Sequence, residues 1–181
     1  MWKDTKVIFI PKPGKESYRQ AKSFRPISLS NYLLKGLERL VVWRMELSLE
    51  NFPLNCKQHG FQKGKSTESA LSHTVNYIES FLMKNQYALG IFLDISSAFD
   101  SICPRHIKNS LYKHGGERDL VEWYFNYLTH RNLQINLQGA SVQVSNGVGF
   151  PQGGVCSAKF WLIASNEAIN IINTPQIEGN G

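Results

Sequence analysis

The apolar and polar positions of the chain follow two different periods, which predict both strands and helices. Residues 5–11, TKVIFIP, have the β-branched and aromatic content of a strand, and the two prolines and the glycine within 11–15 end it. From Ser30 to about Glu50, apolar residues recur every three or four positions, which predicts a helix with Ser30 or Asn31 as its cap. Its expected apolar stripe comprises Leu33, Leu34, Leu37, Leu40, Val41 and Met45.

The rest of the chain continues this mixture. A loop over 51–65 leads to a second helix that ends near Asn85, and the apolar run 87–95 is typical of a buried strand with an acid, Asp94, at its end. Further helices are predicted over 104–115, 117–131 and 157–173, and a hairpin around Gly139-Ala140. The order of these elements indicates an α+β chain.

Composition excludes several classes of protein. The chain has 181 residues, of which 42% are hydrophobic, so it can bury a core and differs from a disordered tail. No apolar run approaches the roughly 20 residues of a membrane span, and the start, MWKDTKVIFIPKPGK, lacks the long apolar stretch of a signal peptide, so we expect an intracellular protein, nuclear or cytoplasmic, without a membrane partner. The three cysteines and five histidines lack the spacing of zinc ligands.

Positive charge is concentrated in the first third of the chain. Residues 1–65 hold 13 Lys and Arg against 5 Asp and Glu, whereas residues 66–181 hold 7 against 9. This asymmetry indicates a lobe that binds a polyanion beside a lobe with another task, although a merely solvated basic surface would have the same composition.

Two acids and one basic segment are candidates for chemistry. A carboxylate at the end of a buried strand, such as Asp94, needs a cation, a metal or a cluster of hydrogen-bond donors nearby, and the alternative is an aspartate that only caps the next turn. Asp100 either faces the same site or caps the next helix. The segment 60–67, GFQKGKST, has one residue too few between its glycines for a phosphate-binding P-loop. Lys63 and Lys65 therefore remain candidates for contact with a nucleic-acid backbone.

Five segments taken together resemble a known family. They are IPKPGK (10–15), SFRPISLSNYLLKGLERLVVWRM (23–45), HGFQKGKSTESAL (59–71), LGIFLDISSAFDSI (89–102) and GFPQGGVCSAKFW (149–161). In this order and spacing they resemble the reverse transcriptase domain of non-LTR retrotransposons, above all the jockey-like elements of invertebrates. Group II intron and telomerase-type polymerases share the core motifs, but RPISLSN and GKSTESAL favour the retrotransposon branch.

The resemblance implies a right-hand polymerase fold and assigns roles to single residues. Asp94 matches the first catalytic, metal-binding aspartate, the main-chain carbonyl of Ile95 matches a second metal ligand, and Asp100 is a possible auxiliary acid. The implied dNTP-binding residues are Lys12, Arg25, Phe99, Gln152 and Gly153. The lysine and arginine would hold the triphosphate, the phenylalanine would exclude a ribose 2′-hydroxyl, and the last two would line the pocket for the nucleotide and the template base.

The implied reaction is RNA-directed DNA polymerisation on an RNA template and a DNA primer, with two Mg²⁺ ions as cofactors. The expected division is fingers over 1–85, palm with the metal-binding Asp over 86–115, a fingers and palm connection over 116–148, and palm again over 149–181. The family's Asp-Asp motif is expected only after TPQIEGNG, so we expect a part of a longer reading frame that is inactive alone. The alternative is an inert or nucleic-acid-binding remnant, whose log affinity would fall by about 0.9 per contacted duplex phosphate as log salt rises.

Overall fold

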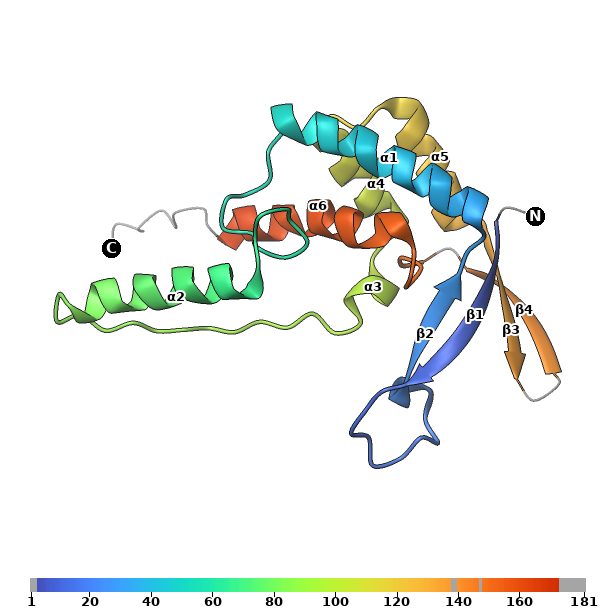
Figure 1. Ribbon diagram of the computed structural model, residues 1–181, viewed down its shortest axis with the longest axis horizontal. Coiled ribbons are helices and arrows are strands. Elements are labelled where there is room, and N and C mark those ends of the chain that lie inside the picture. Colours follow the sequence, from blue (N-terminus) through green and yellow to red (C-terminus); the bar gives the residue numbers. More distant parts are fainter. Residues whose placement is uncertain (1–2, 138–139, 147, 173–181) are drawn as a thin grey trace, which may run out of the picture. The chain divides into compact units, whose positions relative to one another are not determined.

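A computed structural model describes residues 3–137, 140–146 and 148–172 (Figure 1). The chain divides into two units. The first unit consists of Met1–Pro53 and Ser97–Ala164, and the second unit consists of Leu54–Ser96 and Ser165–Gly181. The mixed α and β content agrees with the coarse fold class expected from the sequence.

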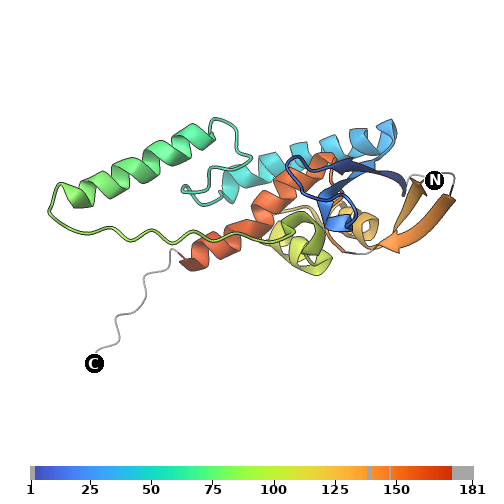
Figure 2. The same ribbon diagram turned by 90° about the horizontal axis from the view of Figure 1, so that it is seen from below.

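A four-stranded sheet lies in the first unit, with the strand order β2-β1-β3-β4. The strands are β1 (Asp4–Pro11), β2 (Phe24–Leu29), β3 (Arg131–Leu137) and β4 (Ala140–Asn146). β1 pairs antiparallel with β2, which places Arg25 opposite Ile10, and parallel with β3. β3 and β4 form the predicted hairpin, coloured orange in Figures 1 and 2. The sheet therefore joins the N-terminal strands to a hairpin far along the chain.

Helices supply the rest of the described structure. They are α1 (Tyr32–Asn51), α2 (Thr67–Leu82), α3 (Ala98–Ser101), α4 (Pro104–Lys113), α5 (Arg118–Thr129) and α6 (Val155–Ile172), with a 3₁₀ turn at Ala21–Ser23. Of the two predicted caps of α1, Ser30 and Asn31, the structure has Asn31, whose Oδ1 accepts a hydrogen bond from Leu34 N at 2.7 Å. None of the described helices is long and apolar enough to cross a membrane.

Helices of the first unit form its apolar core. The buried apolar side chains include Leu34, Val41, Met45, Ile107, Leu111, Val121, Tyr124, Leu128, Phe160 and Ile163. The rings of Tyr124 and Phe160 meet edge to face at 4.6 Å and join α5 to α6. The predicted stripe of α1 is only partly correct, because Leu33 is 70% exposed whereas Glu38 is fully buried. The buried face of α1 thus carries an acid between its apolar residues.

The second unit is built around α2, whose N-terminus has reciprocal capping. Ser69 N donates to Ser66 Oγ at 3.1 Å, and Ser66 N donates to Ser69 Oγ at 2.9 Å. The preceding loop is attached to the C-terminal half of α6, where Asn55 N donates to Asn166 Oδ1 at 2.8 Å. Polar contacts, more than apolar burial, hold this unit, since no residue of α2 is buried.

The prediction of a buried strand over 87–95 is wrong. This segment has no strand pairing and runs as an extended trace in Figure 1. The side chains of Phe92 and Leu93 are 94% and 79% exposed. A strand needs a neighbour to satisfy its backbone N–H and C=O groups. The described strands pair among themselves in the sheet of the first unit, so none is a partner for this segment.

Candidate functional site

Three segments of the first unit line an open cavity of about 410 Å³. Its lining residues are Arg25 of β2, Phe99 of α3, Gln152, Gly153 and Gly154 of the loop before α6, and Ser157 and Ala158 of α6. Four of the five residues expected to bind dNTP therefore share one cavity. The fifth, Lys12, is not in its lining, and its main-chain N–H donates to Ser23 O at 2.8 Å, where it closes the β1–β2 connection.

The loop that carries Gln152 begins at a glycine that no other residue could replace without strain. Gly149 has a φ of +72°, and a Cβ added there would lie 2.6 Å from Phe99 O and 2.7 Å from Asp100 O. The same close approach produces two hydrogen bonds, from Gly149 N to Ile102 O at 3.0 Å and from Phe150 N to Phe99 O at 2.6 Å. The loop is thereby attached to α3.

The same loop is also attached to β2. Ser28 N donates to Gln152 O at 2.7 Å, and Gly153, with a φ of +101°, brings its Cα so close that an added Cβ would lie 3.0 Å from Ser28 O. On the other side, Gln152 Nε2 donates to Asp100 Oδ1 at 3.2 Å. Asp100 therefore orients the glutamine at the cavity, a contact that sequence reasoning did not anticipate.

The Phe99 ring has aromatic neighbours on two elements. Its centroid lies 6.1 Å from that of Phe150 and 5.6 Å from that of Trp161. Trp161 and the lining residue Ser157 were both missed by sequence reasoning. A signal existed, because the two are four positions apart in the helix that directly follows GFPQGG and so share one helical face.

Two buried charged side chains lie at the ends of this loop. Arg131, 1% exposed, donates from Nη2 to Val148 O at 2.8 Å and to Gly149 O at 2.9 Å. Glu38, fully buried, accepts at Oε2 from the main-chain N–H of Val155 at 3.0 Å. Neither residue was predicted, although an acid on the stripe Leu34, Glu38, Val41, Met45 of a predicted amphipathic helix is a detectable anomaly.

Burial raises the pKa of Glu38, and the hydrogen bonds from Val155 and Cys156 and the charges of Lys35 and Arg131 offset only part of that rise. Burial likewise lowers the pKa of the Arg131 guanidinium. The phenol of Tyr124 is also fully buried, and its pKa is raised well above the ordinary value. The interior beside the loop therefore disfavours charge.

The pH dependence of stability follows from the raised pKa of Glu38. A carboxyl with a raised folded-state pKa contributes stability that is complete below its unfolded value, 4.5, and is lost as pH rises through its folded value. We expect the free energy of unfolding of the wild type, relative to Glu38→Gln, to fall as pH rises above 4.5. Denaturant titrations of both proteins between about pH 4 and pH 8 measure this. Parallel curves for the two proteins would contradict the assignment.

Asp94 and Ile95 lie in the second unit, in the exposed segment that was predicted to be a strand. Asp94 is itself exposed. Its carboxylate therefore does not need a nearby cation to offset burial, contrary to the expectation from the sequence. In the described ranges, no group of three or more His, Cys, Asp or Glu is arranged to hold a metal ion. Mg²⁺ is commonly held by one or two carboxylates with waters and substrate phosphates, so Asp94 fits as one ligand of such a set.

Lys63 and Lys65, the candidates for backbone contact, differ in their surroundings. Lys63 is exposed, whereas the ammonium of Lys65 donates to Cys56 O and, at 2.8 Å, to Gln58 O. Lys65 thus stabilises its own loop. Because its ammonium has three hydrogens and these contacts use two of them, one remains for a phosphate.

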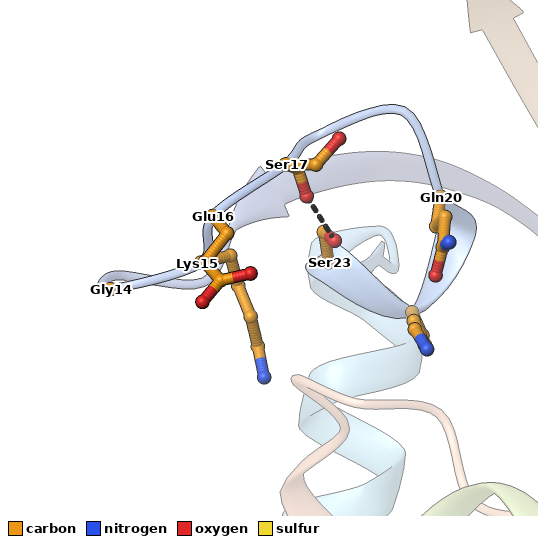
Figure 3. A pocket seen from close by; sticks show the side chains of 7 residues that line it. Gly14, Lys15, Glu16, Ser17, Gln20 and Ser23 are labelled. Carbon is orange, nitrogen blue, oxygen red and sulfur yellow. Dashed lines mark hydrogen bonds between the residues drawn. The ribbon is translucent and has the colours of Figure 1, made fainter.

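A second cavity of about 410 Å³ lies within the β1–β2 connection, shown in Figure 3. Its lining residues are Gly14, Lys15, Glu16, Ser17, Gln20, Lys22 and Ser23. Ser23 Oγ donates to Ser17 O at 2.6 Å across the loop, the dashed line in Figure 3. The lining carries two lysines and one acid, so its charge is mixed.

Comparisons with known proteins agree with the resemblance of the five segments. The family model described as Reverse transcriptase (RNA-dependent DNA polymerase) matches residues 10–177. Similar proteins include the probable RNA-directed DNA polymerase from transposon X-element of Drosophila melanogaster, 31% identical over 92% of this chain and 18% of that protein. The RNA-directed DNA polymerase from mobile element jockey of Drosophila funebris is 32% identical over 91% of this chain and 18% of that protein.

These relatives are much longer than the present chain, which spans about 18% of their length. The matched region, residues 10–177, nevertheless includes every residue that lines the first cavity. The chain belongs to the reverse transcriptase (RNA-dependent DNA polymerase) family, as its five segments indicated.

Proposed function

We propose that this chain is the part of a non-LTR retrotransposon RNA-directed DNA polymerase that binds the incoming dNTP, and that the nucleotide occupies the first cavity. The observation that carries the proposal is the convergence of Arg25, Phe99, Gln152 and Gly153 on that one cavity. These four residues belong to three separate segments of the sequence, 23–45, 89–102 and 149–161.

Each lining residue has a chemical task in this proposal. Arg25 is exposed at the rim, and its guanidinium suits the oxygens of a triphosphate. The Phe99 ring, backed by Phe150 and Trp161, faces the sugar, where a 2′-hydroxyl would lose hydration without gaining a partner. Gln152, oriented by Asp100, and Gly153 would contact the base pair that forms. Lys12 would add positive charge near the triphosphate.

Members of this family use divalent metal ions, and we assign Mg²⁺ to this chain. The carboxylate of Asp94 and the main-chain carbonyl of Ile95 would hold the ion together with the nucleotide phosphates. When bound, Mg²⁺ neutralises charge on the phosphates during transfer. Asp100 is the proposed auxiliary acid. It accepts a hydrogen bond from Gln152 Nε2 at 3.2 Å and so positions the glutamine at the cavity.

An RNA template and a DNA primer complete the proposed set of partners. We assign the fingers to 1–85, the palm to 86–115 and 149–181, and their connection to 116–148. Lys63 and the remaining hydrogen of the Lys65 ammonium are the proposed contacts to a nucleic-acid backbone.

The sugar specificity of the cavity tests the proposal. In the presence of Mg²⁺ and a primed RNA template, we expect the wild type to bind dGTP more tightly than GTP, and Phe99→Val to reduce that preference by about tenfold or more because the ring no longer excludes the 2′-hydroxyl. Isothermal titration gives both affinities without requiring polymerisation.

The matched control is Phe125→Val in α5, whose ring lies 4.6 Å from Lys108 Nζ and outside the lining of the cavity. It should leave the preference for dGTP unchanged. A wild type without any preference, or an equal change in both variants, would refute the assignment of Phe99.

A further inference from the structure

Glu38 reaches the main chain at the C-terminal end of the cavity loop. Its Oε2 accepts from Val155 N at 3.0 Å, and Val155 is the first residue of α6. The main-chain carbonyl of Glu38 accepts from Cys156 Sγ at 3.4 Å. The first N–H groups of a helix have no partner within the helix, and a negative group is favoured there. Glu38 therefore caps α6 from a different helix.

The contact extends to the loop itself. A Cβ added at Gly154 would lie 3.1 Å from Glu38 Oε1, so the carboxylate lies against the last residue of the loop. In the first turn of α6, Ser157 Oγ donates to Pro151 O at 2.7 Å, and this hydrogen bond connects the helix back to the loop. Displacement of the α6 N-terminus would thus be transmitted to Pro151 and its neighbour Gln152.

Arg131 acts at the other end of the same loop. Its guanidinium donates to the carbonyls of Val148 and Gly149, at 2.8 and 2.9 Å, and Nε donates to Leu128 O at 3.2 Å. Both buried charged side chains therefore bind main-chain atoms, and these atoms flank the segment 150–154. A side chain retained only for packing would not require such partners, because an apolar residue of similar volume is often equally stable in a core.

We propose that Glu38 and Arg131 are positioning residues that fix the two ends of the cavity loop and thereby determine where Gln152 and Gly153 meet the nucleotide. The effect on nucleotide binding rests on the proposed function, whereas the effect on the loop does not. Neither residue is in the lining of the cavity. They act through the main chain of residues 148, 149 and 155.

Three variants of the full chain test the role of Glu38. Glu38→Met fills a similar volume without an acceptor, Glu38→Gln keeps an acceptor for Val155 N without the charge, and Val41→Ala perturbs the same buried face of α1 away from the loop. Val41 is 4% exposed. The readouts are amide hydrogen exchange over 150–156 and the affinity for dGTP with Mg²⁺.

We expect Glu38→Met to accelerate exchange at Val155 and to weaken dGTP binding, each by about tenfold, the effect of losing one hydrogen bond to a charged group. Glu38→Gln should restore both values to within about threefold of the wild type because the acceptor is retained. Val41→Ala should lower global stability by about 1 kcal/mol or more without a selective change over 150–156.

The outcomes separate the two proposals. Equal behaviour of Glu38→Met and Val41→Ala over 150–156 overturns the positioning role, whatever the wild type binds. If the wild type fails to bind dGTP while Glu38→Met still accelerates exchange selectively, the nucleotide assignment fails and the positioning role stands. Should Glu38→Met not fold, Glu38→Asp, which is one methylene too short to reach Val155 N, replaces it in both measurements.

Discussion

Replacing Arg25 with alanine is expected to weaken dNTP binding by about ten- to a hundredfold, the loss of one charge-assisted contact of roughly 1.5 to 3 kcal/mol. Arg25 lies on β2 at the rim of the cavity, where it is exposed. Among the described residues it has no ion-pair partner, so its charge is available to an anion. Arg25→Lys should recover part of the affinity, because the charge is kept but the bidentate geometry is lost.

Arg19→Ala is the matched control for this experiment. Arg19 is also exposed and belongs to the connection between β1 and β2, but it does not line the cavity. Both substitutions remove one positive charge, so a general electrostatic effect on the polyanionic ligand would appear equally in the two proteins. Titration with dGTP at two salt concentrations distinguishes them. Equal losses would show that Arg25 contributes only to net charge.

Replacing Arg131 with methionine is expected to lower the free energy of unfolding by about 3 to 5 kcal/mol, the usual effect of removing one member of a buried charged set. Three carbonyls would lose their donor, those of Leu128, Val148 and Gly149. The buried carboxylate of Glu38 would also lose a compensating charge. Denaturant unfolding of the variant and the wild type measures the difference.

The exposed Arg105 is the control for this change, and Arg105→Met should alter stability by no more than about 0.5 kcal/mol. Combining Arg131→Met with Glu38→Gln should restore part of the loss, because the double variant no longer buries an uncompensated negative charge. A loss below about 1 kcal/mol for Arg131→Met would contradict the stabilising role assigned to these three hydrogen bonds.

Local sequence signals predicted most helices and strands of the chain. β1, the β3–β4 hairpin and the helices α1, α2, α4, α5 and α6 all lie close to their predicted ranges. Caps explain this accuracy, since Asn31 and Ser66 each accept a hydrogen bond from an N–H within the next turn. Such contacts involve residues three positions apart, and so they are encoded locally.

β2 was missed because Pro26 interrupts its apolar pattern. Proline lacks an N–H and is normally confined to edge strands. Among the described strands β2 lies at the edge of the sheet and pairs with β1 alone, so the missing donor is tolerated. Whether a strand lies at an edge or in the centre depends on the whole sheet, and residues 24–29 alone do not contain that information.

The segment 87–95 shows the opposite error. Its apolar, β-branched and aromatic residues satisfy every local criterion for a buried strand. It remains exposed because strand formation requires hydrogen-bonding partners from another segment, and no described strand pairs with it. Its catalytic role, carried by Asp94, remains a prediction from the family resemblance.

Residue patterns alone were sufficient to identify the family, the charge asymmetry, most helices and strands, and Arg25, Phe99 and Gln152 as candidate site residues. That these residues line one cavity, and that Glu38 and Arg131 bind the main chain at the ends of its loop, became visible only in the folded chain. This difference arises because caps and periodicity act within a few residues, whereas strand pairing and buried hydrogen bonds join positions that are distant in sequence and leave no local pattern.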